Sequence, residues 1–164
     1  MDSSYLLRDL ATFLREDQLL SSAEDVSVYA FDGTAMLHNR PACVVFPESG
    51  DEVAKILALC NQLSVPVVTR GSGTGLAGGA VPSEGGLVLC LVRLNKILEL
   101  DAANLVMVCE PGVLTQKIAD EALAAGLFYP PDPGSIKIST IGGNVANNSG
   151  GLRGLKYGVT RDYI

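Results

Sequence analysis

Apolar residues along this chain follow two different spacings, and the helical one predicts three helices. It runs through Ser3–Gln18, where leucines and a phenylalanine share one face and charged residues lie away from it. A second helix is expected over residues 49–63, because a serine followed three residues later by a glutamate precedes an apolar run. A third is expected over residues 115–125, with Gly126 as its natural end. Residues 21–40 are mixed and polar, which indicates an irregular crossing.

Short apolar runs between these helices predict the strands. Cys43–Phe46 and Val65–Thr69 flank the second helix and form a β-α-β pattern. Leu87–Val92 predicts a further strand. Leu98–Leu100 and Leu105–Cys109 are joined by a short turn, which indicates an antiparallel pair. The chain therefore has the pattern of a mixed α+β domain.

The stretch around which the chain is organised is the loop Thr69–Ala80, TRGSGTGLAGGA, directly after the second strand. Five of the nine residues from Gly71 to Gly79 are glycines. Glycine loses the most conformational freedom on folding, so such a cluster indicates a backbone that approaches a ligand closely. Successive amides in such a turn can bind an anion. We interpret the loop as a phosphate or diphosphate site, with a flexible surface loop as the alternative.

A second loop of the same character is expected at residues 139–151, STIGGNVANNSGG. Its asparagines and serines offer amide and hydroxyl groups, and its glycines allow close approach. The alternative is an ordinary Gly/Asn turn region. Two such stretches in one domain favour ligand contact.

The residues from Gly73 onward indicate which type of nucleotide site the first loop can form. Residues 73–78 fit the pattern G-x-G-x-x-G, but a Rossmann-type site needs that turn to open a helix. Gly79, Pro82, Gly85 and Gly86 oppose a helix there. The alternative of an NAD-dependent Rossmann enzyme stays open only if a helix follows Gly78 directly. Spacing alone leaves a dinucleotide held by two glycine-rich loops.

Composition and charge exclude several classes of function. The net charge is −6, which argues against nucleic acid. Lys and Arg nevertheless outnumber Asp and Glu in residues 66–98 and 133–164, the segments that hold the two loops, and this distribution suits a small anionic cofactor. Four scattered cysteines and a single histidine, His38, predict buried free thiols and no metal site. No apolar run reaches membrane-spanning length and no signal peptide is evident, so we expect a cytoplasmic protein.

Three stretches together carry a resemblance to a known family. PVVTRGSGTGLAGGAVP, YPPDPGSIKISTIGGNVANNSGG and GLKYGVTRDYI closely resemble the FAD-binding domain of the vanillyl-alcohol-oxidase/PCMH flavoprotein family. Its members of the glycolate oxidase and D-lactate dehydrogenase type are the most similar. The resemblance covers residues 40–164 and leaves 1–39 as an N-terminal helical segment. It implies a PCMH-type fold with a small β-α-β lobe, a second lobe with a mainly antiparallel sheet, and FAD between them.

The resemblance also implies which residues hold the cofactor. Members with covalent flavin carry a histidine at about the place of Thr74, so FAD is expected to bind non-covalently. The first loop is expected to contact the diphosphate, Asp132–Ser135 to approach the flavin, and the remaining residues to wrap the cofactor. The predicted cofactor-binding residues are Arg70, Gly71, Ser72, Gly73, Thr74, Gly75, Leu76, Gly79, Asp132, Pro133, Gly134, Ser135, Gly142, Gly143, Asn144, Ala146, Asn147, Gly150, Gly151, Tyr157 and Gly158.

The activity implied by the resemblance is that of an FAD-dependent 2-hydroxy-acid oxidase or dehydrogenase. In that family further strands and a substrate domain come after a sequence like residues 159–164. We therefore expect a truncated chain without catalytic residues, inactive alone and prone to self-association. The family also allows an iron–sulfur electron-transfer subunit and a peripheral position at a membrane through partner subunits. The alternative is a non-catalytic flavin- or nucleotide-binding fragment that acts only with another chain.

Overall fold

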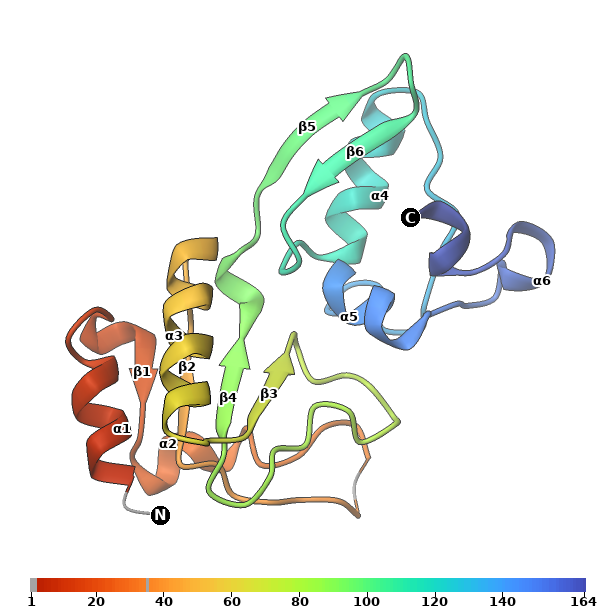
Figure 1. Ribbon diagram of the computed structural model, residues 1–164. Helices are drawn as coiled ribbons and strands as arrows, with labels where there is room; N and C mark the ends of the chain where they lie inside the picture. The colour runs from red at the N-terminus through yellow and green to blue at the C-terminus, as the bar shows by residue number, and fades with distance from the viewer. Residues whose placement is uncertain (1–2, 35) are drawn as a thin grey trace. The chain divides into compact units, whose positions relative to one another are not determined.

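The computed structural model describes residues 3–34 and 36–164, and it divides into two compact units, one ending at Arg93 and one running from Leu94 to Ile164 (Figure 1). The first unit holds α1 (Ser3–Leu10), a 3₁₀ helix (Glu16–Gln18), β1 (Leu19–Leu20), α2 (Ala23–Ser27), β2 (Cys43–Val45), α3 (Gly50–Gln62), β3 (Val67–Arg70), β4 (Leu87–Cys90) and a 3₁₀ helix (Leu91–Arg93). The second holds β5 (Ile97–Asp101), β6 (Val106–Cys109), α4 (Thr115–Ala124), α5 (Ile141–Asn147), α6 (Gly154–Tyr157) and a 3₁₀ helix (Thr160–Tyr163).

The first unit is built on a four-stranded sheet in the order β1-β2-β4-β3. β2, β4 and β3 are parallel, and β1 is antiparallel to β2. Side chains alternate across the sheet, as strand geometry requires. Cys43 and Val45 pack with Ile56 of α3 and Leu10 of α1, whereas Val44 packs with Val26 of α2. Helices therefore cover both faces, and the predicted β-α-β unit is confirmed with β4 inserted between its two strands.

Helix α3 begins where the sequence pattern places it. The Ser49 hydroxyl accepts a hydrogen bond from the Glu52 amide at 3.2 Å. The Glu52 carboxylate in turn accepts from the Glu48 amide at 2.7 Å, one residue earlier than in a standard capping box. Both bonds satisfy amides that have no partner inside the helix. The predicted start of the helix is confirmed.

The predicted N-terminal helix is shorter than its periodicity indicates, because α1 ends at Leu10. Gln18, at the end of the predicted helix, is fully buried and donates to the Phe46 carbonyl at 3.1 Å and to the Glu52 carboxylate at 2.9 Å. These contacts draw the chain onto β2, where it continues as β1. A long-range polar contact thus overrides the local helical pattern.

The segment 21–40 is also more regular than predicted, because it contains α2. The Ser22 hydroxyl caps this short helix by accepting from the Asp25 amide at 3.1 Å. Val26 is 1% exposed and forms the centre of the core on that face of the sheet. The serine followed three residues later by an acid was the available sequence signal.

Four charged side chains form a network on the surface of the first unit. Arg15 pairs with Glu48 at 2.7 Å, and Arg93 pairs with Asp17 at 2.6 Å and with Glu48 at 2.9 Å. The hydrogen bond from Arg15, followed by that from Arg93, lowers the pKa of both Asp17 and Glu48. The network therefore favours the ionised carboxylates in the folded state.

We expect this network to make stability depend on pH. A depressed folded-state pKa stabilises the fold above the unfolded pKa, and this contribution is lost as the pH falls through about 4 and below. Unfolding midpoints measured between about pH 6 and about pH 3 should fall less in Arg15→Gln than in the wild-type chain. Equal pH slopes for the two chains would contradict this. Because the groups are exposed, high salt should reduce the difference.

The second unit is built on the β5–β6 hairpin and α4. The antiparallel pair is confirmed, and the Asp101 carboxylate holds its turn by accepting from the amides of Ala103 and Asn104 at 3.1 and 3.0 Å. Val113, Ile118 and Ile141 form the small core of this unit. Helix α4 ends as predicted, with Gly126 at φ +75°.

The stretch 139–151 differs from its prediction as a loop, because residues 141–147 form α5. The Thr140 hydroxyl caps this helix by accepting from the Gly143 amide at 3.3 Å. A side chain on Gly142 would meet Cβ of Pro111 at 2.8 Å and its carbonyl oxygen at 2.9 Å. Close packing against Pro111 therefore accounts for one of the four glycines of this stretch.

Membrane-spanning helices, metal-binding clusters and the cysteines are three features for which the sequence makes a prediction. No helix in residues 3–34 or 36–164 is long and apolar enough to cross a membrane. Among the same residues there is no group of three or more His, Cys, Asp or Glu side chains that could hold a metal ion. The cysteines are free, with Cys43, Cys60 and Cys90 buried, and burial raises the pKa of the Cys43 thiol to about 12.

Candidate functional site

The first glycine-rich loop leaves the carboxyl end of β3 and runs as coil to β4. Residues 71–86 are all described and contain no helix. The Rossmann alternative requires a helix directly after Gly78, so it is wrong for this chain. Gly73 and Gly78 both have φ +72°, a backbone conformation that favours glycine.

Several amides of this loop are left without partners. Within the described part of the chain, the amides of Gly73, Thr74, Leu76 and Ala77 have no hydrogen-bond acceptor. By contrast, the next amide, that of Gly78, donates to the Thr34 hydroxyl at 3.1 Å. Unpaired amides in an αL-containing turn are the usual elements of an anion-binding backbone concavity. The loop therefore has several amide donors available for a negatively charged group.

Arg70 supports the start of the loop from inside the unit. Its side chain is only 7% exposed and donates to the Phe31 carbonyl at 2.6 Å, with the guanidinium 5.4 Å from the centre of the Tyr29 ring. A Cβ on Gly73 would overlap this guanidinium. Gly73 is thus required both by its φ angle and by the space that Arg70 occupies.

The other side of the loop is held by residues 31–34, which belong to the segment predicted from the sequence as an irregular crossing (Figure 1). The Gly33 amide donates to the Gly75 carbonyl at 2.8 Å. The Asp32 carboxylate accepts from the Thr34 amide at 2.7 Å and, weakly, from the Ala80 amide at 3.5 Å. The only local signal for this contact was the Asp-Gly-Thr sequence in a polar stretch.

Asp32 is 6% exposed and remains a carboxylate in this setting. Burial alone would raise its pKa. The hydrogen bonds from Thr34 and Ala80 and the charge of Arg70 outweigh burial, so the pKa of Asp32 lies below its ordinary value. The ionised side chain is therefore matched to the amide donors around it.

The remaining predicted site residues lie in the second unit, where two of their segments meet. The backbone of Gly151 packs so closely on Asp132 that a Cβ there would overlap the Asp132 carbonyl. The Arg153 amide donates to the Asp132 carboxylate at 3.1 Å. The Pro133 carbonyl accepts from Ile136, which closes the turn that contains Gly134 and Ser135. The structure thus brings residues 132–135 and 150–153 together.

Helix α5 separates its predicted site residues into two kinds. Asn144 is 2% exposed and its side-chain amide donates to the Thr115 hydroxyl at 2.5 Å. Ala146 and Asn147 are exposed on the same helix. Asn144 is thus engaged in internal packing, whereas Asn147 is accessible to a ligand. A cofactor contact for either residue stays a prediction.

The end of the chain folds back on the same region. Both the amide and the hydroxyl of Thr160 donate to the Ser149 carbonyl, at 3.0 and 2.6 Å. Gly158 has φ +85°, and a Cβ there would overlap the Asp162 carboxylate. The Tyr163 hydroxyl donates to the Tyr157 carbonyl at 2.5 Å. These contacts hold residues 149–158 as an ordered segment.

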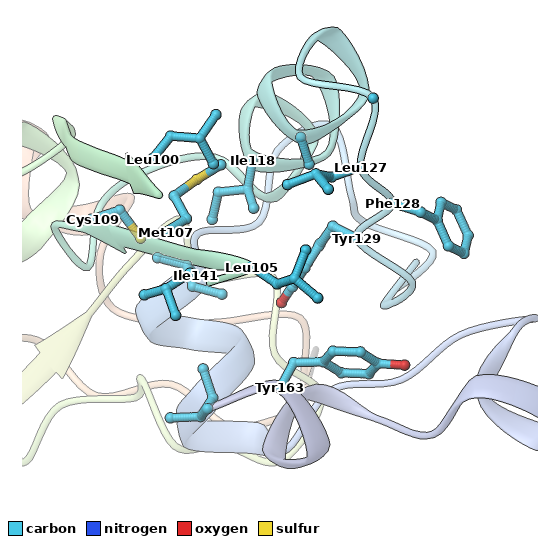
Figure 2. A pocket seen from close by; sticks show the side chains of 14 residues that line it. Leu100, Leu105, Met107, Cys109, Ile118, Leu127, Phe128, Tyr129, Ile141 and Tyr163 are labelled. Carbon is cyan, nitrogen blue, oxygen red and sulfur yellow. The ribbon is translucent and has the colours of Figure 1, made fainter. Parts of the chain in front are cut away.

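The second unit also contains an apolar cavity of about 510 Å³, which lies between the hairpin, α4 and the C-terminal 3₁₀ helix (Figure 2). The Tyr129 hydroxyl is buried there and has no hydrogen-bond partner in the described part of the chain. Burial, followed by Cys109 and Tyr163, raises the pKa of Tyr129 to about 12. The residues lining the cavity are Leu100, Leu105, Val106, Met107, Cys109, Ile118, Ala122, Gly126, Leu127, Phe128, Tyr129, Ile141, Tyr163 and Ile164.

Comparison with curated proteins identifies close relatives. The chain is 54% identical over 137 residues to glycolate oxidase subunit GlcD of Bacillus subtilis, covering 84% of this chain and 29% of that protein. It is 49% identical over 125 residues to D-lactate dehydrogenase of Anaerostipes hadrus, covering 76% of this chain and 26% of that protein. The chain thus spans about a third of these relatives' length or less.

Comparison with solved structures supports the fold. A structure of alkyldihydroxyacetonephosphate synthase superposes with a TM-score of 0.85 at 24% identity, covering 96% of this chain and 34% of that one. p-Cresol methylhydroxylase superposes with a TM-score of 0.78 at 20% identity, covering 91% and 30%. At these identities the likeness concerns the fold alone. Residues 41–164 match the family model described as FAD binding domain, and this chain therefore belongs to the FAD binding domain family.

Proposed function

We propose that the chain holds the diphosphate of FAD in the loop from Arg70 to Gly79. This proposal rests mainly on the unpaired amides of Gly73, Thr74, Leu76 and Ala77, in the loop that follows the carboxyl end of β3. A diphosphate is compact, anionic and rich in acceptors, which suits a loop with several unpaired N–H donors. Arg70 is already engaged by Phe31, so in this proposal it shapes the loop while the backbone binds the phosphates.

The same proposal assigns the second-unit residues to the rest of the cofactor. The predicted contacts there are the site residues of the second unit named from the sequence, Gly134, Asn147 and Gly150 among them. A Cβ on Gly134 would meet no atom within 4 Å, so its surroundings leave room for a ligand. Thr74 cannot form the histidyl link found in covalent flavoproteins, which supports non-covalent binding. The limits of the FAD-binding domain, residues 40 and 164, remain those predicted from the sequence.

We further propose that the protein carrying this chain is a flavin-dependent 2-hydroxy-acid oxidoreductase. Bound FAD supplies the two-electron oxidation of an alcohol carbon, and the protein supplies binding and orientation. Support comes from relatives named glycolate oxidase subunit and D-lactate dehydrogenase at about half identity. A hydroxy-acid site outside this chain, an iron–sulfur partner subunit and a cytoplasmic or membrane-peripheral location complete the proposal. The competing proposal is a non-catalytic flavin-binding fragment that acts with another chain.

Two measurements test these proposals in turn. The purified chain is mixed with FAD and passed through gel filtration, and flavin absorbance is expected to elute with the protein. The protein carrying this chain is then treated anaerobically with glycolate or D-lactate, with acetate as a control that lacks only the hydroxyl of glycolate. Loss of flavin absorbance with glycolate or D-lactate, but not with acetate, supports oxidation of the hydroxy acid by the flavin. Bound flavin that no 2-hydroxy acid reduces favours the competing proposal.

We also propose that the chain self-associates through the mouth of the apolar cavity. Leu105, Val106 and Phe128 line that cavity and are 72%, 48% and 55% exposed. A two-stranded sheet with bare edges and apolar side chains favours pairing with another chain. Light scattering should show oligomers that decrease in Leu105→Asn, because Asn tolerates the φ of +59° at this position and is polar. A monomeric wild-type chain at high concentration would contradict this.

A further inference from the structure

Residues 31–34 contact the glycine-rich loop at several points along its length. Phe31 accepts from Arg70 at the end of β3, Gly33 bonds Gly75 in the middle, and Thr34 accepts from Gly78 near the far end. The coil continues alongside the next residues, since the Asn39 side chain donates to the Pro82 carbonyl at 3.1 Å. The segment therefore follows the loop from one end to the other.

The unpaired amides lie between these points of attachment. Gly73 and Thr74 lie between the Arg70 and Gly75 contacts, and Leu76 and Ala77 lie between the Gly75 and Gly78 contacts. Residues 31–34 thus bind the loop at points that leave these four amides unpaired. A site whose donors are held in place before binding loses less conformational entropy when the ligand arrives.

We propose that residues 31–34 are a positioning element for the FAD diphosphate, in which Gly33 and Thr34 hold the loop amides in their binding arrangement. This inference rests on the proposed placement of the diphosphate in the loop. Asp32 contributes because its carboxylate accepts hydrogen bonds from the Thr34 amide of the same segment and from the Ala80 amide of the loop. None of these residues is required to touch the cofactor.

Gly33 provides the sharpest test because its role is steric. A Cβ at Gly33 would meet the carbonyl oxygen of Gly75 at 2.7 Å and Cδ2 of Leu76 at 2.8 Å. Gly33→Ala therefore pushes on the loop directly, without a positive φ to add strain. Gly50→Ala is the matched control, because a Cβ there meets no atom within 4 Å. FAD affinity should fall by about tenfold or more in Gly33→Ala and by less than about twofold in the control.

The hydrogen bonds are tested by two further pairs of variants. Thr34→Val removes the acceptor for Gly78 and should weaken FAD binding by about two- to tenfold, whereas Thr34→Ser keeps the hydroxyl and restores affinity. Asp32→Asn is compared with Asp101→Asn, whose carboxylate likewise accepts the amides of a tight turn but lies in the other unit. Only Asp32→Asn should weaken binding.

Two readouts distinguish positioning from general stability. The ³¹P resonances of bound FAD should move toward their free positions in Gly33→Ala and Thr34→Val and stay unchanged in the controls. Amide ¹⁵N order parameters of residues 73–77, measured without ligand, should fall from about 0.85 to below about 0.6 in the same two variants. Wild-type affinity together with unchanged order parameters in both variants would overturn the proposal.

Failure of the positioning role and failure of the proposed function give different results. If the wild-type chain binds no FAD, the proposed diphosphate site fails, and the order parameters of the ligand-free chain still decide whether residues 31–34 hold the loop. If FAD binds equally well to all variants, the positioning role fails while FAD binding stands. A loss confined to Gly33→Ala, Thr34→Val and Asp32→Asn supports both.

Discussion

Gly73→Ala is expected to abolish detectable binding of FAD. Gly73 has φ +72°, which costs an L-residue about 1–2 kcal/mol, and the new Cβ would overlap the guanidinium of buried Arg70. Arg70 cannot move freely because it donates to the Phe31 carbonyl at 2.6 Å. The loop backbone must therefore shift, which displaces the unpaired amides of Gly73 and Thr74. Titration of the variant with FAD, monitored through flavin fluorescence, measures the loss of binding.

Gly85→Ala is the matched control for backbone strain. Gly85 has φ +69°, almost the same as Gly73, but a Cβ there would meet no atom within 4 Å. Both variants should lose about 1 kcal/mol of unfolding free energy from the φ angle, and only Gly73→Ala should lose FAD. Urea unfolding measures the first effect. Unchanged FAD affinity in Gly73→Ala would remove the loop from the cofactor site.

Asn144→Ala is expected to destabilise the second unit by about 1–3 kcal/mol, because it removes one partner of a buried hydrogen bond. Asn144 donates to the Thr115 hydroxyl, which is itself 3.1 Å from the carbonyl oxygen of Ser139. Both Asn144 and Thr115 are almost fully buried, so water cannot replace the lost partner. The variant also weakens the link between α5 and the start of α4. Urea unfolding of the chain measures the effect.

Asn147→Ala is the control from the same helix. Asn147 is exposed, so its loss should change stability by less than about 0.5 kcal/mol. The sequence assigns both asparagines to the cofactor, and the structure predicts opposite consequences for them. Asn147→Ala should lower FAD affinity without loss of stability, whereas Asn144→Ala should lower stability. Equal unfolding free energies for the two variants would contradict the structural role of Asn144.

Local features of the sequence were sufficient to predict most of the elements. The periodicity of residues 49–63 and the Ser49–Glu52 pair predicted α3 and its cap, because both signals act within one or two helical turns. Turn residues between two apolar runs predicted the β5–β6 hairpin for the same reason. The sequence also indicated the glycine-rich loop and its resemblance to an FAD-binding family.

The tertiary structure decided the features that depend on contacts between distant residues. Gln18, at the end of the predicted first helix, bonds to Phe46, and Gly142 packs too closely on Pro111 to carry a side chain. The hydrogen bond between Gly33 and Gly75 belongs to the same class. Periodicity carries no information about a pair so far apart in sequence.

By itself, then, the sequence determined α3, α4, the main strands, the glycine-rich loop and the FAD-binding family, because periodicity, turn chemistry and motif order depend on neighbouring residues. Only the tertiary structure decided that residues 31–34 hold that loop and that Asn144 is buried while Asn147 is accessible. Burial and long-range hydrogen bonds arise when the chain packs, and they select which polar residues support the fold and which remain free to bind.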